Sequence, residues 1–201
     1  MTILPTTYWG NIEYFARFIE AGEEHRIDLG EHYIKRSERN RTTIMTANGV
    51  MALSVPLCHA NRPRTPITAM QIDNSTRWQH RHWTAITSAY RSSAYFDVIA
   101  DRIEPLYEQR FESLVELNEA TLRASIELAR LGVEPHYSHD YITATEQALD
   151  LRPKHRESTI APQPYFQLFC DRYPFTPNLS ILDLMMSDLI STRDYLTRVV
   201  K

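Results

Sequence analysis

The sequence predicts an α/β fold, with α+β as the alternative, in one layered domain that spans residues 1–201. The period of the apolar residues is about two in the first part and about 3.6 from residue 78 onward. An Asn-Gly turn joins two strand-like runs. No Pro- or Gly-rich linker and no internal repeat divides the chain. We therefore expect a small mixed sheet of about four or five strands, including a β-hairpin, packed against a helical C-terminal half.

The first 30 residues are expected to form two short strands around one helix. Residues 2–4 are extended before Pro5, and residues 26–29 form the second candidate strand. Residues 11–21 predict a helix that Gly22 ends, because glycine tolerates the left-handed conformation that follows many helices. The apolar face of this helix consists of Ile12, Phe15, Ala16 and Ile19.

A β-hairpin is the clearest local signal in the chain. Residues 42–47 and 50–55 are expected as its strands. Asn48 and Gly49 are expected as the two central residues of a type I′ turn, since both positions of that turn need a positive φ. A third strand is expected at residues 67–72, where the side chains alternate.

Helices are expected to dominate from residue 78. The first begins at Trp78, and His82, Ile86, Ala89 and Tyr90 continue its apolar face. Pro105 is expected to break the second helix or to lie in a first turn. Ser180 and Asp183 form a capping-box pattern ahead of the last helix. The further expected elements are helices at residues 95–110, 111–129, 164–172 and 181–189 and a strand at residues 141–145.

Composition and motifs exclude several classes of protein. The N-terminus has no basic region followed by an apolar run, so we expect no signal peptide and no membrane insertion. Two cysteines, Cys58 and Cys170, without CxxC spacing argue against a disulfide framework or a structural zinc site and favour the cytoplasm. The sequence contains no Walker loop, GxGxxG, GxSxG or HExxH motif.

The histidines do not predict a metal site. His80 and His82 are two residues apart and would point to different sides of a helix, so we expect no metal. Cys58 and His59 are neighbours in the chain, and we do not expect them to act as a nucleophile and its base. No cofactor is predicted by the sequence.

Positive charge is concentrated in residues 25–91. This window holds 10 Lys or Arg against 4 Asp or Glu, whereas the whole chain has a net charge of −3. A local basic region in an acidic protein suits a small anion better than a nucleic-acid duplex. The alternative is that surface arginines are unevenly distributed by chance.

Residues 31–49 are the predicted binding segment. Lys35, Arg39 and Arg41 are expected to hold phosphate or carboxylate oxygens. His32 or Tyr33 is the candidate acid or base, and His32 is favoured because its ordinary pKa lies near neutrality. Asn40, Asn48 and Trp78 are expected to orient the substrate, and Arg77 to line the same pocket. The alternative for residues 31–41 is a solvated, charged surface turn.

Motifs along nearly the whole chain resemble the WbqC-like bacterial proteins. The resemblance is carried by Tyr8-Trp9-Gly10, His32-Tyr33-Ile34-Lys35, Arg39-Asn40-Arg41, Asn48-Gly49, Leu117-Asn118, Tyr165-Phe166-Gln167 and Asn178-Leu179-Ser180-Ile181-Leu182-Asp183-Leu184. It implies a WbqC-like domain over residues 1–201 and an association with surface-polysaccharide (O-antigen) biosynthesis. It also implies transfer of an acyl or aminoacyl group to a sugar.

Taken together, these features predict an enzyme of the transferase kind that binds an anionic, activated small molecule. The alternative is a non-catalytic binding module for a nucleotide-sugar or a partner enzyme. A third hypothesis is a structural interaction protein that uses the acidic helical half. A homodimer is a candidate assembly.

Overall fold

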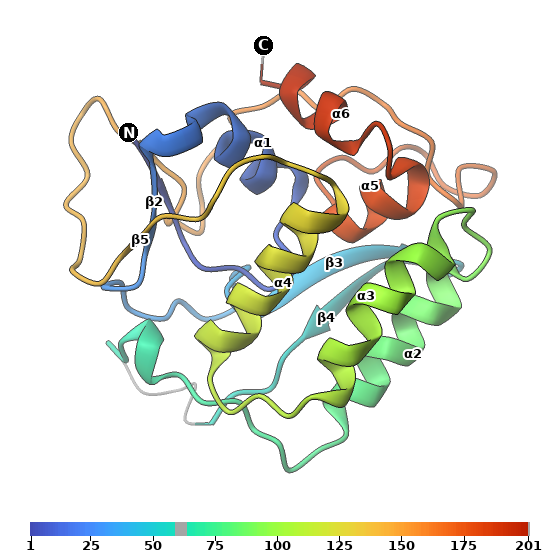
Figure 1. The fold of residues 1–201 in the computed structure, drawn as a ribbon, viewed down its shortest axis with the longest axis horizontal. Coiled ribbons are helices and arrows are strands. Elements are labelled where there is room, and N and C mark those ends of the chain that lie inside the picture. Colours follow the sequence, from blue (N-terminus) through green and yellow to red (C-terminus); the bar gives the residue numbers. More distant parts are fainter. Residues whose placement is uncertain (59–63, 201) are drawn as a thin grey trace.

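The protein contains a four-stranded parallel sheet, part of which lies on the left of Figure 1. The computed structural model describes residues 1–58 and 64–200. The strands are β1 (Thr2–Leu4), β2 (His25–Asp28), β5 (Tyr137–Ser138) and β6 (Leu149–Asp150), in the order β5-β2-β1-β6. β1 is parallel to both of its neighbours, with Thr2 opposite His25 on one side and Leu149 on the other. The predicted α/β class is confirmed.

Helix α1 (Ile12–Ala21) connects β1 to β2 as predicted. The Asn11 side chain caps the helix by accepting a hydrogen bond from the Tyr14 amide at 2.8 Å. Gly22 ends the helix with a φ of 52°, a conformation that a side chain would strain. A single 3-10 turn, η1 (Gly22–Glu24), then leads into β2.

The hairpin consists of β3 (Arg41–Thr46) and β4 (Gly49–Ser54), but its turn differs from the prediction. Thr46 pairs with Gly49, so Ala47 and Asn48 are the two loop residues, and neither has a positive φ. The positive φ, 93°, belongs to Gly49. Thr46 closes the turn with its hydroxyl, which accepts from the Asn48 amide at 3.2 Å. Glycine is therefore needed one position later than in a type I′ turn.

The helical periodicity from residue 78 is confirmed. α2 (Trp78–Tyr90), α3 (Phe96–Glu108) and α4 (Leu114–Leu128) follow one another, and Pro105 lies within the last turn of α3. Ser180 caps α5 (Ile181–Asp188), which is followed by α6 (Thr192–Arg198). Figure 1 shows the hairpin between the parallel strands on one side and α2 and α3 on the other.

Three predicted elements are wrong. Residues 67–72 form a 3-10 turn, η2 (Ile67–Ala69), followed by isolated bridges. Ile67 and Met70 are three residues apart and both buried; this spacing puts them on the same side of a 3-10 turn but on opposite faces of a strand. Residues 141–145 form no strand, and residues 164–172 form no helix, since 164–167 have no regular structure and 168–172 are turns. The side chain of Gln167 holds both the amide and the carbonyl oxygen of Thr176, which stabilises a loop in place of a helix.

One hydrophobic core joins these elements. It receives buried side chains from the parallel sheet, the hairpin and the helices, including Leu4, Phe15, Ile27, Ile44, Ile86, Ile103, Leu117 and Leu182. No helix within the described residues combines the length and the apolar character needed to cross a membrane.

Candidate functional site

A polar pocket of about 300 Å³ lies at the carboxyl ends of β1 and β6. Pro5 follows β1, and Leu151 and Arg152 follow β6, and all three line it. The chain places β2 on one side of β1 and the last strand, β6, on the other. In open parallel sheets, ligands bind outside the carboxyl ends of the strands at the point where the strand order reverses. The pocket lies at that point.

Four segments far apart in the sequence supply the remaining walls. They are the start of α1, the loop before β3 with β3 itself, a strap that we define as residues 153–159, and the loop before α5. Their lining residues are Asn11, Glu13, Arg36, Ser37, Glu38, Arg39, Arg41, Thr43, Pro153, Lys154, Arg156, Ser158 and Asn178.

Three of the cationic side chains around the pocket are neutralised by carboxylates. Arg39 pairs with Glu31, Arg152 with Asp28 and Asp150, and Arg156 with Glu13. These pairs hold the walls in place and leave little charge for a ligand.

Three other cations of the pocket have no carboxylate partner among the described residues. Arg36, Arg41 and Lys154 are exposed and line the pocket. None of them forms an ion pair with any residue in 1–58 or 64–200. Arg41 donates from Nε to the Ser54 hydroxyl at 2.9 Å, and its two terminal nitrogens have no hydrogen-bond partner among residues 1–58 and 64–200. The pocket therefore has a net positive field.

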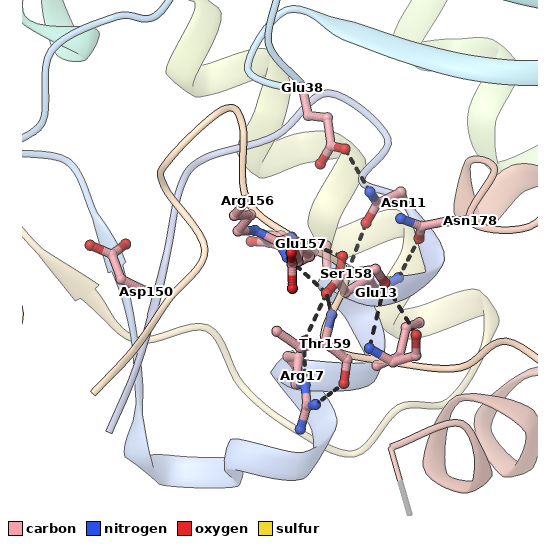
Figure 2. A network of polar contacts seen from close by, with 12 residues as sticks. Asn11, Glu13, Arg17, Glu38, Asp150, Arg156, Glu157, Ser158, Thr159 and Asn178 are labelled. Carbon is pink, nitrogen blue, oxygen red and sulfur yellow. Dashed lines mark hydrogen bonds and ion pairs between the residues drawn. The ribbon is translucent and has the colours of Figure 1, made fainter. Parts of the chain in front are cut away.

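Glu13 anchors the strap to α1 (Figure 2). Glu13 is 2% exposed, and its carboxylate accepts hydrogen bonds from both terminal nitrogens of Arg156, at 2.8 and 2.9 Å. It also accepts hydrogen bonds from the amide and the hydroxyl of Thr159, at 2.6 and 2.7 Å. Burial by itself would raise the pKa of Glu13, but these hydrogen bonds outweigh it and the pKa lies below its ordinary value. Both oxygens of Glu13 are thus occupied.

Glu38 is a second carboxylate of the pocket, and Figure 2 shows it pointing to Asn11. The Asn11 amide nitrogen donates to Glu38 Oε1 at 2.6 Å. The Glu38 residue is exposed, yet desolvation by the surrounding protein raises the pKa of its carboxyl above the ordinary value. Asn178 lies beside this pair and accepts from the Glu13 amide at 2.8 Å.

One lining residue of the pocket, Arg39, forms a buried ion pair with Glu31. Arg39, 2% exposed, donates from Nε to Glu31 Oε1 at 2.9 Å and from Nη2 to Oε2. Burial raises the pKa of Glu31 to about 7, although the hydrogen bonds from Arg39 favour the ionised form. The guanidinium of Arg39 is therefore occupied within the fold.

The structure separates the residues predicted from the segment 31–49. Arg39 and Arg41 line the pocket, whereas His32, Tyr33, Lys35 and Asn40 lie outside it. His32 and Lys35 are exposed. Tyr33 is half-buried and donates to Asn40 Oδ1 at 3.0 Å, and Asn40 donates to the Val55 carbonyl oxygen at 2.8 Å. The last two side chains stabilise the entry to the hairpin.

Three more predicted residues lie elsewhere. Trp78 is fully buried and donates from Nε1 to Asn74 Oδ1 at 3.1 Å. Arg77 is exposed at the start of α2. Asn48 is exposed and borders a separate groove between the hairpin and α2. These three do not share a surface with Arg39.

Cys58, His80 and His82 do not form a common site in the described residues. His82 is buried, with Nδ1 2.9 Å from the Tyr8 hydroxyl, whereas His80 is exposed. The Cys58 thiol is 3.8 Å from the Ile72 carbonyl oxygen, and His59 falls outside the described residues. No cluster that could hold a metal ion occurs in residues 1–58 and 64–200.

Sequence reasoning missed the residues that the second half of the chain brings to the pocket. A signal was present in the run Arg152-Pro153-Lys154-His155-Arg156, a basic stretch inside the acidic half. Asn11, Glu13 and Asn178 carried only the ordinary signs of helix starts.

Comparison with known proteins identifies one family. The profile described as the WbqC-like protein family matches residues 7–161, which include every pocket segment except Pro5 and Asn178. The chain is 34% identical over 110 residues to the uncharacterised protein Rv1507c of Mycobacterium tuberculosis (strain ATCC 25618 / H37Rv), a match that covers 54% of this chain and 47% of the relative. The match thus spans about half of the relative's length. No solved structure matches the chain.

Proposed function

The chain belongs to the WbqC-like protein family, and on that premise we propose that its pocket binds the phosphate or carboxylate of an activated small molecule for group transfer. The reaction that we propose is the transfer of an acyl or aminoacyl group to a sugar, in the cytoplasm, during surface-polysaccharide biosynthesis. The acceptor oxygen then bonds to the acyl carbon, the bond from that carbon to the leaving group breaks, and the acceptor proton passes to a base.

One observation carries this proposal: Arg36, Arg41 and Lys154 converge on one pocket without a carboxylate partner in the described residues. Arginine forks bind phosphate and carboxylate oxygens in pairs, and lysine adds a point charge. Cations placed where a leaving group gains negative charge stabilise the transition state of group transfer. The position of the pocket at the strand ends supports the same conclusion.

The experiment is a binding titration with pyrophosphate as the probe. The wild-type protein should bind pyrophosphate, and each of Arg36→Ala, Arg41→Ala and Lys154→Ala should weaken binding about tenfold, as expected for the loss of one charge-assisted hydrogen bond. Arg77→Ala is the matched control, because it removes one exposed positive charge outside the pocket. The proposal is refuted if wild type does not bind pyrophosphate, or if Arg77→Ala weakens binding as much as the pocket variants.

The second candidate is the non-catalytic module for a nucleotide-sugar or a partner enzyme. It is favoured by the placement of His32 and Tyr33, the predicted acid and base, outside the lining of the pocket. Incubation with nucleotide-sugars and acyl donors, followed by product analysis, separates the two. Ligand-induced stabilisation without product supports the module, and product supports the enzyme.

A further inference from the structure

The pocket offers many hydrogen-bond donors and one carboxylate with an acceptor to spare. Arg36, Arg41 and Lys154 present donors only. The other lining carboxylate, Glu13, has both oxygens occupied by Arg156 and Thr159. Glu38 uses only Oε1, and Oε2 has no hydrogen-bond partner within the described chain.

The fold determines the orientation of the Asn11 side-chain amide, and this amide in turn holds the Glu38 carboxylate in position. As the N-cap of α1, Asn11 must present Oδ1 to the Tyr14 amide, which lies 2.8 Å away. Its amide nitrogen therefore points to Glu38 Oε1, at 2.6 Å. This contact fixes the carboxylate with Oε2 directed away from the cap (Figure 2).

A carboxylate in an anion-binding pocket repels the same ligand charge that the cations attract, and this repulsion must be offset by a favourable contact with the ligand. A hydroxyl group of the ligand can make that contact, since an O–H donor forms a strong hydrogen bond with a carboxylate. A ligand that satisfies both halves of the pocket carries both an anionic group and a hydroxyl group.

We propose that Glu38, positioned by Asn11, accepts a hydrogen bond from a ligand hydroxyl, so that the pocket selects phosphate esters of polyols over anions without hydroxyl groups. This inference rests on the proposed anion binding and narrows the substrate class to phosphorylated sugars and related polyols. Glu38 is a specificity residue in this assignment, and Asn11 is a positioning residue.

Two probes of equal charge test the inference: methyl phosphate, which has no hydroxyl group, and glucose 1-phosphate. The wild-type protein should bind glucose 1-phosphate at least about tenfold more tightly, the ratio expected for one charge-assisted hydrogen bond. Glu38→Gln should weaken glucose 1-phosphate and strengthen methyl phosphate, because it removes both the charged acceptor and the repulsion. Glu112→Gln, at an exposed carboxylate outside the pocket, should leave both affinities unchanged.

A second variant covers the case in which Glu38→Gln does not fold. Asn11→Asp keeps a good helix cap and replaces the donor to Glu38 by a carboxylate, so it should reduce the selectivity for glucose 1-phosphate while the helix remains. Equal binding of both probes to wild type, or equal weakening of both by Glu38→Gln, overturns this inference and leaves anion binding intact. If neither probe binds to the wild-type protein, the proposed function itself is overturned.

Discussion

Arg156 contacts Glu13 through both ends of its guanidinium, with Nη1 2.8 Å from Oε1 and Nη2 2.9 Å from Oε2, across 143 positions of the sequence. Thr159 reinforces the contact with its amide and hydroxyl. The outer wall of the pocket is thereby attached to the first turn of α1, and the shape of the site depends on this pair.

Arg156→Ala should detach the strap from α1. Glu13 is 2% exposed and would lose a bidentate partner, so we expect a loss of about 2 kcal/mol in the free energy of unfolding, below the 3–5 kcal/mol of a fully buried pair because Arg156 itself is partly exposed. Hydrogen exchange should accelerate at residues 153–159. Arg123→Ala is the control, since its exposed pair with Glu119 should contribute less than about 0.5 kcal/mol. Unchanged exchange in the strap would contradict the anchoring role.

Arg39→Ala should destabilise the fold by about 3–5 kcal/mol, because it leaves Glu31 buried without its cation. Chemical denaturation measures the loss. Arg36→Ala, at an exposed position of the same pocket, should change stability by less than about 0.5 kcal/mol. If Arg39→Ala were as stable as wild type, the structural role of Arg39 would be wrong.

Trp78→Ala should cost about 3–5 kcal/mol of stability, since the indole is fully buried in the core. Its neighbour Arg77 is exposed, and Arg77→Ala should change the free energy of unfolding by no more than about 0.5 kcal/mol. Denaturation of the two variants side by side tests whether Trp78 acts in packing. A small loss for Trp78→Ala would show that this position tolerates a cavity and does not support the core.

His82 should remain neutral well below the ordinary range for histidine. Burial lowers the pKa of its imidazole to about 4, from about 6.5 in the unfolded chain. A lowered folded-state pKa means that the unfolded chain binds the proton more tightly, so stability falls as pH decreases from about 6.5 through about 4, by about 3 kcal/mol at most. Nitrogen NMR of the ring checks the protonation state at pH 5. The pH dependence of stability should be weaker in His82→Phe, and an imidazolium signal at pH 5 would contradict the prediction.

Local signals predicted a large part of the fold because their causes lie within a few residues. Asn11 caps α1 and Gly22 ends it through hydrogen bonds and dihedral angles of the same segment. The hairpin at residues 41–54 follows from alternation and a turn, although the positive φ belongs to Gly49 alone. By contrast, β5 and β6 have two residues each, too few for any periodicity to show.

The sequence by itself determined the class of fold, the basic character of residues 25–91 and most helix limits, since these depend on composition and short-range pattern. Only the tertiary structure decided which charges face a ligand. Arg39 and Lys154 are both cations in the sequence, but Glu31 neutralises Arg39 in the interior, while Lys154 reaches the pocket without an ion pair in the described chain. Whether a cation is available to a ligand depends on its burial and on its partner, which for Arg156 is Glu13, 143 positions away. No local pattern in the sequence encodes such a contact.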